Sequence, residues 1–235
     1  MLCHVLKYGE IYFYNFCIAA DSMNTTTQQE TVQTPEHESE VSKKRPKPGE
    51  RRVQILQTLA AMLEAASAER ITTAALAKKL DVSEAALYRH FASKAQMFEG
   101  LIEFIESSVF SLINQIYERE ANPKVQVAKI MTMLLQFAEK NPGMARVMAG
   151  DALVFENERL QQRMNQFFDR FESSLKQSLR LLADVQKSST PTVDAQVKAS
   201  VLTAFVVGRV QRFTRTGFKR MPTEHLDASL AQLLA

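Results

Sequence analysis

Apolar residues recur every three or four positions along most of the chain after residue 49, which predicts a largely helical protein. The longest series runs over residues 156–183, where Leu160, Met164, Phe167 and Leu175 fall on one helical face. The same spacing predicts further helices over residues 50–65, 94–119, 145–149, 193–217 and 224–234. No segment shows the alternation typical of a strand, so we expect an all-α fold.

Two Asn-Pro pairs mark further helix starts. Asn122-Pro123 and Asn141-Pro142 each place a potential N-capping side chain before a proline, which favours the first helical position. The first pair should open a helix that reaches about Ala138. The second should open the short helix that ends at Ala149.

The segment 71–98 has the pattern of two short helices, a tight turn between them and a capped third helix. Asp81-Val82 would form the turn, and Ser83 would cap a second helix reaching about Phe91. Ala77 supplies the small side chain that two steeply crossing helices need where their backbones meet. The pattern predicts a helix-turn-helix, whose second helix enters the major groove of DNA.

We expect this motif to contact DNA with two groups of side chains. Short residues at the start of the second helix let it approach base edges, while neighbouring polar residues suit phosphates. The predicted DNA-binding residues are Thr72, Thr73, Ser83, Glu84, Ala85, Ala86, Tyr88, Arg89, His90 and Lys94. Simpler roles remain open. Either threonine would serve as a helix cap alone, Glu84 as a helix-dipole partner, and His90 as a surface residue near a domain joint.

The third helix should follow at once. Ser93 and Gln96 have capping-box spacing, in which each side chain satisfies a free backbone N–H of the other residue. We therefore expect residues 49–93 to form a DNA-binding head and residues 94–235 to form a helical body for dimerisation and partner binding.

Charge is distributed unevenly, although the formal net charge is only +3. Residues 43–94 hold eleven Lys and Arg against five Asp and Glu, whereas the rest of the chain holds eighteen against twenty-one. A basic module on a mildly acidic body is typical of a DNA reader attached to a domain that does not touch DNA. The arm 43–52 would add salt-sensitive affinity, with a solvated tail as the alternative.

Residues 1–48 form a predicted disordered extension. Residues 24–42 contain four Glu and no Lys or Arg, a composition typical of disorder. Residues 1–22 carry both cysteines, and their apolar run is short and aromatic for a signal peptide, so we expect translation to start at Met23. The cysteine usage and the short apolar runs of the remainder predict a cytoplasmic protein.

The helices predicted over 156–183 and 193–217 are long, adjacent and broadly apolar. Such a pair, presented to its symmetry mate, makes a four-helix dimer interface. The residues predicted at this interface are Phe167, Phe168, Phe171, Leu175, Val201 and Phe205. A dimer would read a palindrome with half-sites about one DNA turn apart. The alternative is that both helices pack only into the core of their own chain.

The sequence contains no recognisable catalytic or metal-binding pattern. His4, His37, His90 and His225 share no metal-ligand spacing with one another or with the cysteines. There is no phosphate-cradling Gly-rich loop and no nucleophile motif. We therefore predict neither an enzyme nor a cofactor.

The helix-turn-helix followed by Leu87-Tyr88-Arg89-His90-Phe91 and Ser93-Lys94 resembles the TetR family of bacterial DNA-binding proteins. That resemblance implies an all-helical dimer with a three-helix N-terminal head. Asp81 stands where the family usually has Gly, and Asp tolerates a left-handed backbone better than most residues.

Further segments narrow the resemblance to one branch of that family, the nucleoid occlusion factors. The likeness covers the chain from about Glu50 to its C-terminus. The five segments that carry it are residues 70–73, 83–91, 101–106, 139–143 and 155–161. Ala92 replaces the Pro that usually precedes Ser-Lys, which should only loosen the cap.

This narrower resemblance implies a function. Such proteins bind palindromic sites on the chromosome and antagonise the division protein FtsZ, so that no septum closes over the nucleoid. It places the FtsZ-binding surface at Phe104, Lys140 and Asn141, with Lys140 where Arg is usual. For Phe104, a place in the core is the alternative. The alternative function is a ligand-responsive repressor, with an inducer pocket lined by Met, Phe and Ala of the body.

Overall fold

The computed structural model describes residues 49–65 and 70–235 of the 235-residue chain. In chain order its elements are α2 (Glu50–Glu64), α3 (Thr73–Lys79), α4 (Glu84–Tyr88), α5 (Lys94–Arg119), α6 (Pro123–Lys140), α7 (Pro142–Ala149), the 3-10 turn η1 (Asp151–Leu153), α8 (Glu158–Val185), α9 (Pro191–Arg215) and α10 (Leu226–Leu233). These ranges contain no strand, which confirms the all-α prediction. The extension predicted over residues 1–48 lies outside them.

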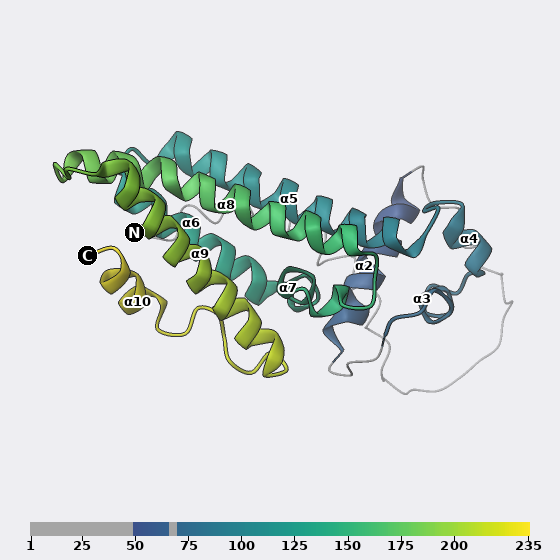
Figure 1. Cartoon of the computed structure of the whole chain (residues 1–235). Coiled ribbons are helices and arrows are strands. Elements are labelled where there is room, and N and C mark those ends of the chain that lie inside the picture. Colours follow the sequence, from purple (N-terminus) through teal and green to yellow (C-terminus); the bar gives the residue numbers. More distant parts are fainter. Residues whose placement is uncertain (1–48, 66–69) are drawn as a thin grey trace, which may run out of the picture.

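The helices form an elongated molecule with α3 and α4 at one end and α10 at the other (Figure 1). α5 starts at the end of the predicted head and continues into the body, where α8 and α9 lie side by side. α7 contacts both α2 and α9, so it joins head and body. Met97, Leu101, Ile105 and Ile116 are buried, as the apolar spacing of residues 94–119 predicts, whereas Leu112 on the same predicted stripe is half-buried.

Part of the surface predicted to join two subunits is instead buried within one chain. Phe167, Phe171 and Leu175 are 1%, 0% and 0% exposed. They face inward because α8 packs against α5, α6 and α9. These three side chains are therefore unavailable to a second subunit, and the prediction that they face one is corrected: they belong to the core of their own chain.

Side-chain caps set two of the helix starts. Asn122 accepts hydrogen bonds from the backbone N–H groups of Lys124 and Val125 at 3.0 and 3.3 Å, which confirms the first Asn-Pro cap. Asn157 caps α8 by accepting from the N–H of Arg159 at 3.1 Å. α8 therefore begins two residues later than the predicted start at residue 156.

Asn141 does not cap the helix that follows it. Its side-chain amide donates to the carbonyl of Phe137 at 2.6 Å, in the last turn of α6, and makes no capping bond to α7. The predicted cap is therefore wrong. α7 nevertheless begins at Pro142, because proline needs no N–H partner in the first turn of a helix.

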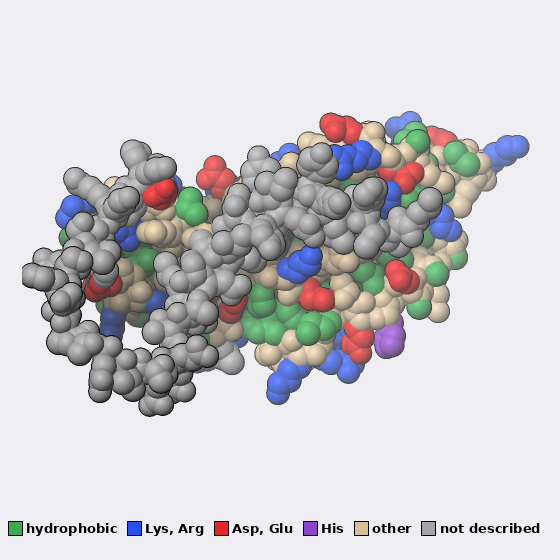
Figure 2. Space-filling model, turned by 180° about the vertical axis from the view of Figure 1, so that it is seen from behind, with side chains coloured by type: hydrophobic (Ala, Val, Ile, Leu, Met, Phe, Trp, Pro, Cys, Tyr) green, Lys and Arg blue, Asp and Glu red, His purple; other side chains and the backbone are tan. Residues whose placement is uncertain are grey.

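None of the described helices is both long and apolar enough to cross a membrane. On the face shown in Figure 2, acidic and basic side chains of the described residues are interspersed.

Candidate DNA interface

Two side-chain caps and one left-handed residue build the helix-turn-helix. Thr72 accepts a first-turn N–H of α3 at 3.1 Å, and Ser83 accepts a first-turn N–H of α4 at 3.2 Å. Between the helices, Asp81 has a φ of 55°, a conformation that Asp tolerates through its short polar side chain. The turn closes with a 3.0 Å hydrogen bond from the Val82 N–H to the Ala77 carbonyl.

The two helices cross over a small buried contact. Ala77 is 3% exposed, and Leu76 and Leu87 are each 1% exposed. α4 ends at Tyr88, short of the predicted end at Phe91, which is buried in the turn that follows. Since a larger side chain than Ala77 would separate the helices, this crossing fixes how α4 is presented.

α4 presents an open face at one end of the molecule (Figure 1). Among the predicted DNA-binding residues, the exposed ones are Thr72, Ser83, Glu84, Ala85, Tyr88 and Arg89, while Thr73, Ala86 and His90 are half-buried. The Glu84 carboxylate accepts a 2.5 Å hydrogen bond from the Thr73 hydroxyl. The structure thus brings these two residues together across the motif, where they brace α4 against α3.

Arg52 of α2 holds the turn after α4. Its guanidinium lies 4.1 Å from the centre of the Phe91 ring and donates a hydrogen bond to the carbonyl of His90. A cation above an aromatic face is attracted by the negative face of the ring. Sequence reasoning assigned Arg52 only to the basic arm, because nothing local in the sequence shows that α2 passes beside residue 91.

Lys94, a residue predicted to contact a DNA phosphate, is paired with a carboxylate of its own chain. Its ammonium pairs with Glu156 in the loop before α8, and only 18% of the Lys94 side chain is exposed. Glu156 also lies 3.6 Å from Nε of Arg70. In this structure Lys94 ties the start of α5 to the body, and its contact with a phosphate stays a prediction.

The predicted capping box at the start of α5 is half confirmed. The N–H of Gln96 donates to the Ser93 hydroxyl at 3.2 Å, as expected. The side chain of Gln96, however, accepts from the N–H of Ala92 at 2.9 Å rather than from that of Ser93. The Gln96 side chain therefore satisfies the backbone N–H of Ala92, one residue before the predicted partner.

The three predicted partner-binding residues differ in accessibility. Lys140 is exposed, whereas Phe104 is half-buried and packs against the core. Asn141 is 5% exposed, and its side-chain amide donates to a carbonyl of its own chain. The prediction that it contacts a partner directly is therefore corrected, because in this structure Asn141 holds the end of α6.

An exposed row of valines follows α9. Val193, Val197 and Val201 are spaced four residues apart and are 59%, 58% and 50% exposed. Val201 is thus accessible, as a dimer contact must be, while Phe168 and Phe205 are half-buried. The spacing of the first two valines was visible in the sequence, but it matches that of a buried stripe equally well.

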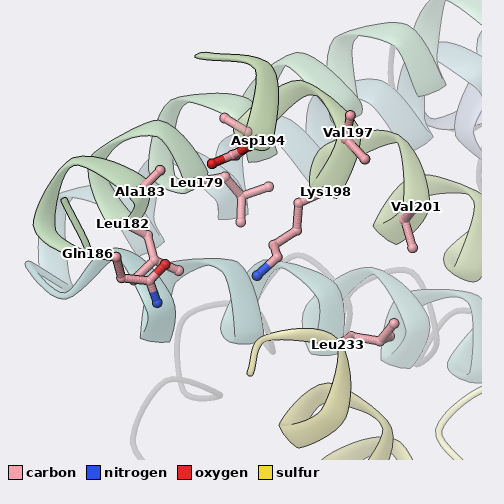
Figure 3. Close-up of a pocket in the computed structure, with 10 residues that line it drawn as sticks. Leu179, Leu182, Ala183, Gln186, Asp194, Val197, Lys198, Val201 and Leu233 are labelled. Carbon is pink, nitrogen blue, oxygen red and sulfur yellow. The ribbon is translucent and has the colours of Figure 1, made fainter. Parts of the chain in front are cut away.

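A groove of about 400 Å³ lies beside this row, between α8, α9 and the end of α10 (Figure 3). Val197, Val201 and Leu182 are among the apolar side chains that line it. Lys198 also lines the groove and donates to the carbonyl of Ala235 at 3.2 Å. The apolar surface of α9 therefore continues into the groove.

The described residues provide no grouping of three or more His, Cys, Asp and Glu side chains that could hold a metal ion.

The chain matches two protein families. Residues 55–101 match the bacterial regulatory proteins of the tetR family, and residues 121–234 match the tetracyclin repressor-like C-terminal domain. Two relatives named nucleoid occlusion factor SlmA are similar over most of its length. The protein of Idiomarina loihiensis is 52% identical over 178 residues, which are 76% of this chain and 90% of the relative. That of Vibrio cholerae is 52% identical over 186 residues, which are 79% of this chain and 94% of the relative.

Solved structures of transcriptional regulators share the fold. FadR of Bacillus subtilis, in a complex with stearoyl-CoA, has a TM-score of 0.62 at 16% identity, over 77% of this chain and 97% of that chain. The TetR family regulator PfmR of Thermus thermophilus has a TM-score of 0.61 at 21% identity, over 77% and 97%. At these identities the likeness concerns the fold alone.

Proposed function

This chain belongs to the SlmA family of TetR-type DNA-binding regulators, and from that premise we propose that it is a nucleoid occlusion factor. Bound to palindromic chromosomal sites, it would antagonise FtsZ and block septation over the nucleoid. Its relatives are regulators, and it is a regulator rather than an enzyme.

The exposed face of α4 supports the DNA-binding part of this proposal. Ser83 and Ala85 present short exposed side chains at the start of α4, which suits a close approach to base edges. Tyr88, which is 45% exposed, and the exposed Arg89 would then reach the flanking phosphates. The Ser83 cap and the buried crossing of α3 and α4 hold this face rigid, so binding costs little conformational entropy.

The valine row on α9 supports a homodimer. Exposed apolar side chains repeated along one helix stabilise a protein when a second surface covers them. With Val193, Val197 and Val201 at its centre, a two-fold contact would place the same residues of both subunits opposite one another. TetR-family regulators act on DNA as dimers, and we propose this row as the contact here.

We propose a surface on α5 and α6 for FtsZ. Lys140 is its exposed charged residue, and Phe104 is its partly accessible aromatic. A half-buried aromatic in a stiff helix is a suitable anchor, because burying it costs little side-chain entropy.

The deciding experiment follows FtsZ polymers by light scattering, with and without a palindromic duplex selected from a random library by this protein. We expect disassembly to be much faster with protein and duplex together than with protein alone. No effect of the DNA-bound protein on the polymers would refute the division role and leave a DNA-binding regulator.

Two variants test the proposed surface. Lys140→Ala should weaken binding to FtsZ and leave DNA binding unchanged, whereas Lys124→Ala, an exposed lysine at the other end of α6, should change neither. Phe104→Ala should act like Lys140→Ala. If Phe104→Ala abolished both activities together, Phe104 would be a core residue.

A further inference from the structure

A buried carboxylate lies in an otherwise exposed loop between η1 and α8. Val154 and Phe155 are 66% and 74% exposed, but the side chain of the next residue, Glu156, is only 8% exposed. Burying a carboxylate costs free energy unless cations and hydrogen bonds replace its water. The residues that pair with Glu156 therefore indicate what its burial contributes to the structure.

Both cations that face Glu156 come from the head side of the molecule. Lys94 is the first residue of α5, and its ammonium pairs with Glu156 with 18% of the lysine side chain exposed. Arg70 lies just ahead of α3, with its Nε 3.6 Å from Glu156. Arg70 also donates to the carbonyl of Phe155 at 3.1 Å. One carboxylate of the body thus holds both ends of the helix-turn-helix segment.

A second contact joins head and body elsewhere. At Gly143 of α7 the backbone approaches α2 so closely that a Cβ would lie 2.1 Å from the carbonyl oxygen of Ala60. α2 packs against both α7 and α5 within one apolar core. Glu156 adds to this joint a polar contact with the two residues that flank the helix-turn-helix.

We propose that Glu156 is a positioning residue for DNA binding. It touches no DNA, but by holding Arg70 and Lys94 it sets the angle of the head on the body. In a dimer it thereby sets the distance between the two copies of α4. This inference rests on the proposed binding of a dimer to a palindrome, whose half-site spacing must match that distance.

The test compares Glu156→Gln with the wild-type protein on selected palindromic duplexes. One duplex has the selected half-site spacing, and a second has one extra base pair between the half-sites. We expect Glu156→Gln to bind the matched duplex about tenfold more weakly, because the half-buried Lys94 loses its charged partner. Its preference for the matched over the lengthened duplex should also shrink, and Glu156→Asp should restore part of both.

A matched control uses another ion pair that α5 makes with the same part of the body. Arg159 of α8 and Glu99 of α5 lie 2.8 Å apart, but both side chains are more exposed, at 53% and 30%. Glu99→Gln should leave affinity and spacing preference unchanged. Thermal unfolding of each variant shows whether it is folded at the assay temperature.

If Glu156→Gln fails to fold, Arg70→Met replaces it, because 61% of the Arg70 side chain is exposed. A loss of spacing preference in Arg70→Met supports the proposal, while equal weakening on both duplexes indicates a phosphate contact and overturns it. Tighter binding by Glu156→Gln, with a steeper salt dependence, would also overturn it, since Glu156 would then compete with DNA for the two cations. If the wild-type protein selects no palindrome, the DNA-binding proposal itself fails.

Discussion

Gly143→Ala should be the most damaging single-methyl change at the joint between head and body. A Cβ at this position would lie 2.1 Å from the carbonyl oxygen of Ala60 and 2.9 Å from its carbonyl carbon. The obstacle is backbone within α2, which cannot rotate away as a side chain can. The two helices must therefore move apart.

The cost of Gly143→Ala follows from that separation. Non-bonded heavy atoms prefer about 3.5–4.0 Å, so α2 and α7 must part by about 1 Å or more, which removes roughly a quarter to a half of the attraction across their contact. Overpacking costs about 1–3 kcal/mol, and the gain from replacing a helical Gly offsets at most about 1 kcal/mol. Because the obstacle is rigid, we expect the free energy of unfolding to fall by about 2 kcal/mol.

Urea unfolding of Gly143→Ala and Gly100→Ala provides the measurement with its control. A Cβ at Gly100 would also meet α2, but at the terminal methyl groups of Leu56, 3.1 Å away. Those methyl groups can move, and Gly100 lies within α5, so this variant should be within about 1 kcal/mol of the wild type. If both variants were equally stable, the close approach at Gly143 would not hold the joint.

Three further changes test the body and the DNA face. Burial raises the pKa of Tyr117 above its ordinary value, so the folded state resists ionisation and stability should fall as pH rises above about 10. In Tyr117→Phe, urea unfolding at several pH values should therefore show a smaller alkaline decline. The variant should also lose about 1 kcal/mol at neutral pH, because the Tyr117 hydroxyl donates a 2.6 Å hydrogen bond to the Ser174 carbonyl. Val197→Asp should convert dimers to monomers in sedimentation without lowering the thermal stability of the monomer, because Val197 is 58% exposed in the single chain; a dimer as stable as that of the wild type would place the interface elsewhere. Tyr88→Ala should weaken binding to a selected palindrome about tenfold, the worth of one hydrogen bond to a charged phosphate, and unchanged affinity at fixed salt would exclude that contact.

The fold could be predicted because its signals are local. The apolar spacing of α5 and α8 lies within single helices, and Ser83 and Asn122 cap the residues next to them in the sequence. Asn141 shows where local reasoning ends. The same residue type before the same proline donates backwards to Phe137, because a side chain between two helices can satisfy the end of one as readily as the start of the next.

Lys94 shows why the site was harder to predict than the fold. Local sequence places a lysine at the start of α5, near DNA, and a phosphate contact is the natural expectation for such a cation. Whether its charge is free depends on Glu156, which is 62 residues away, and on the loop that turns this carboxylate inward while Val154 and Phe155 face solvent. Neither the apolar periodicity nor the capping residues of the sequence predict this ion pair. Cations at a head–body joint therefore cannot be assigned to DNA from sequence alone, since the same residue either contacts a phosphate or sets the position from which its neighbours do.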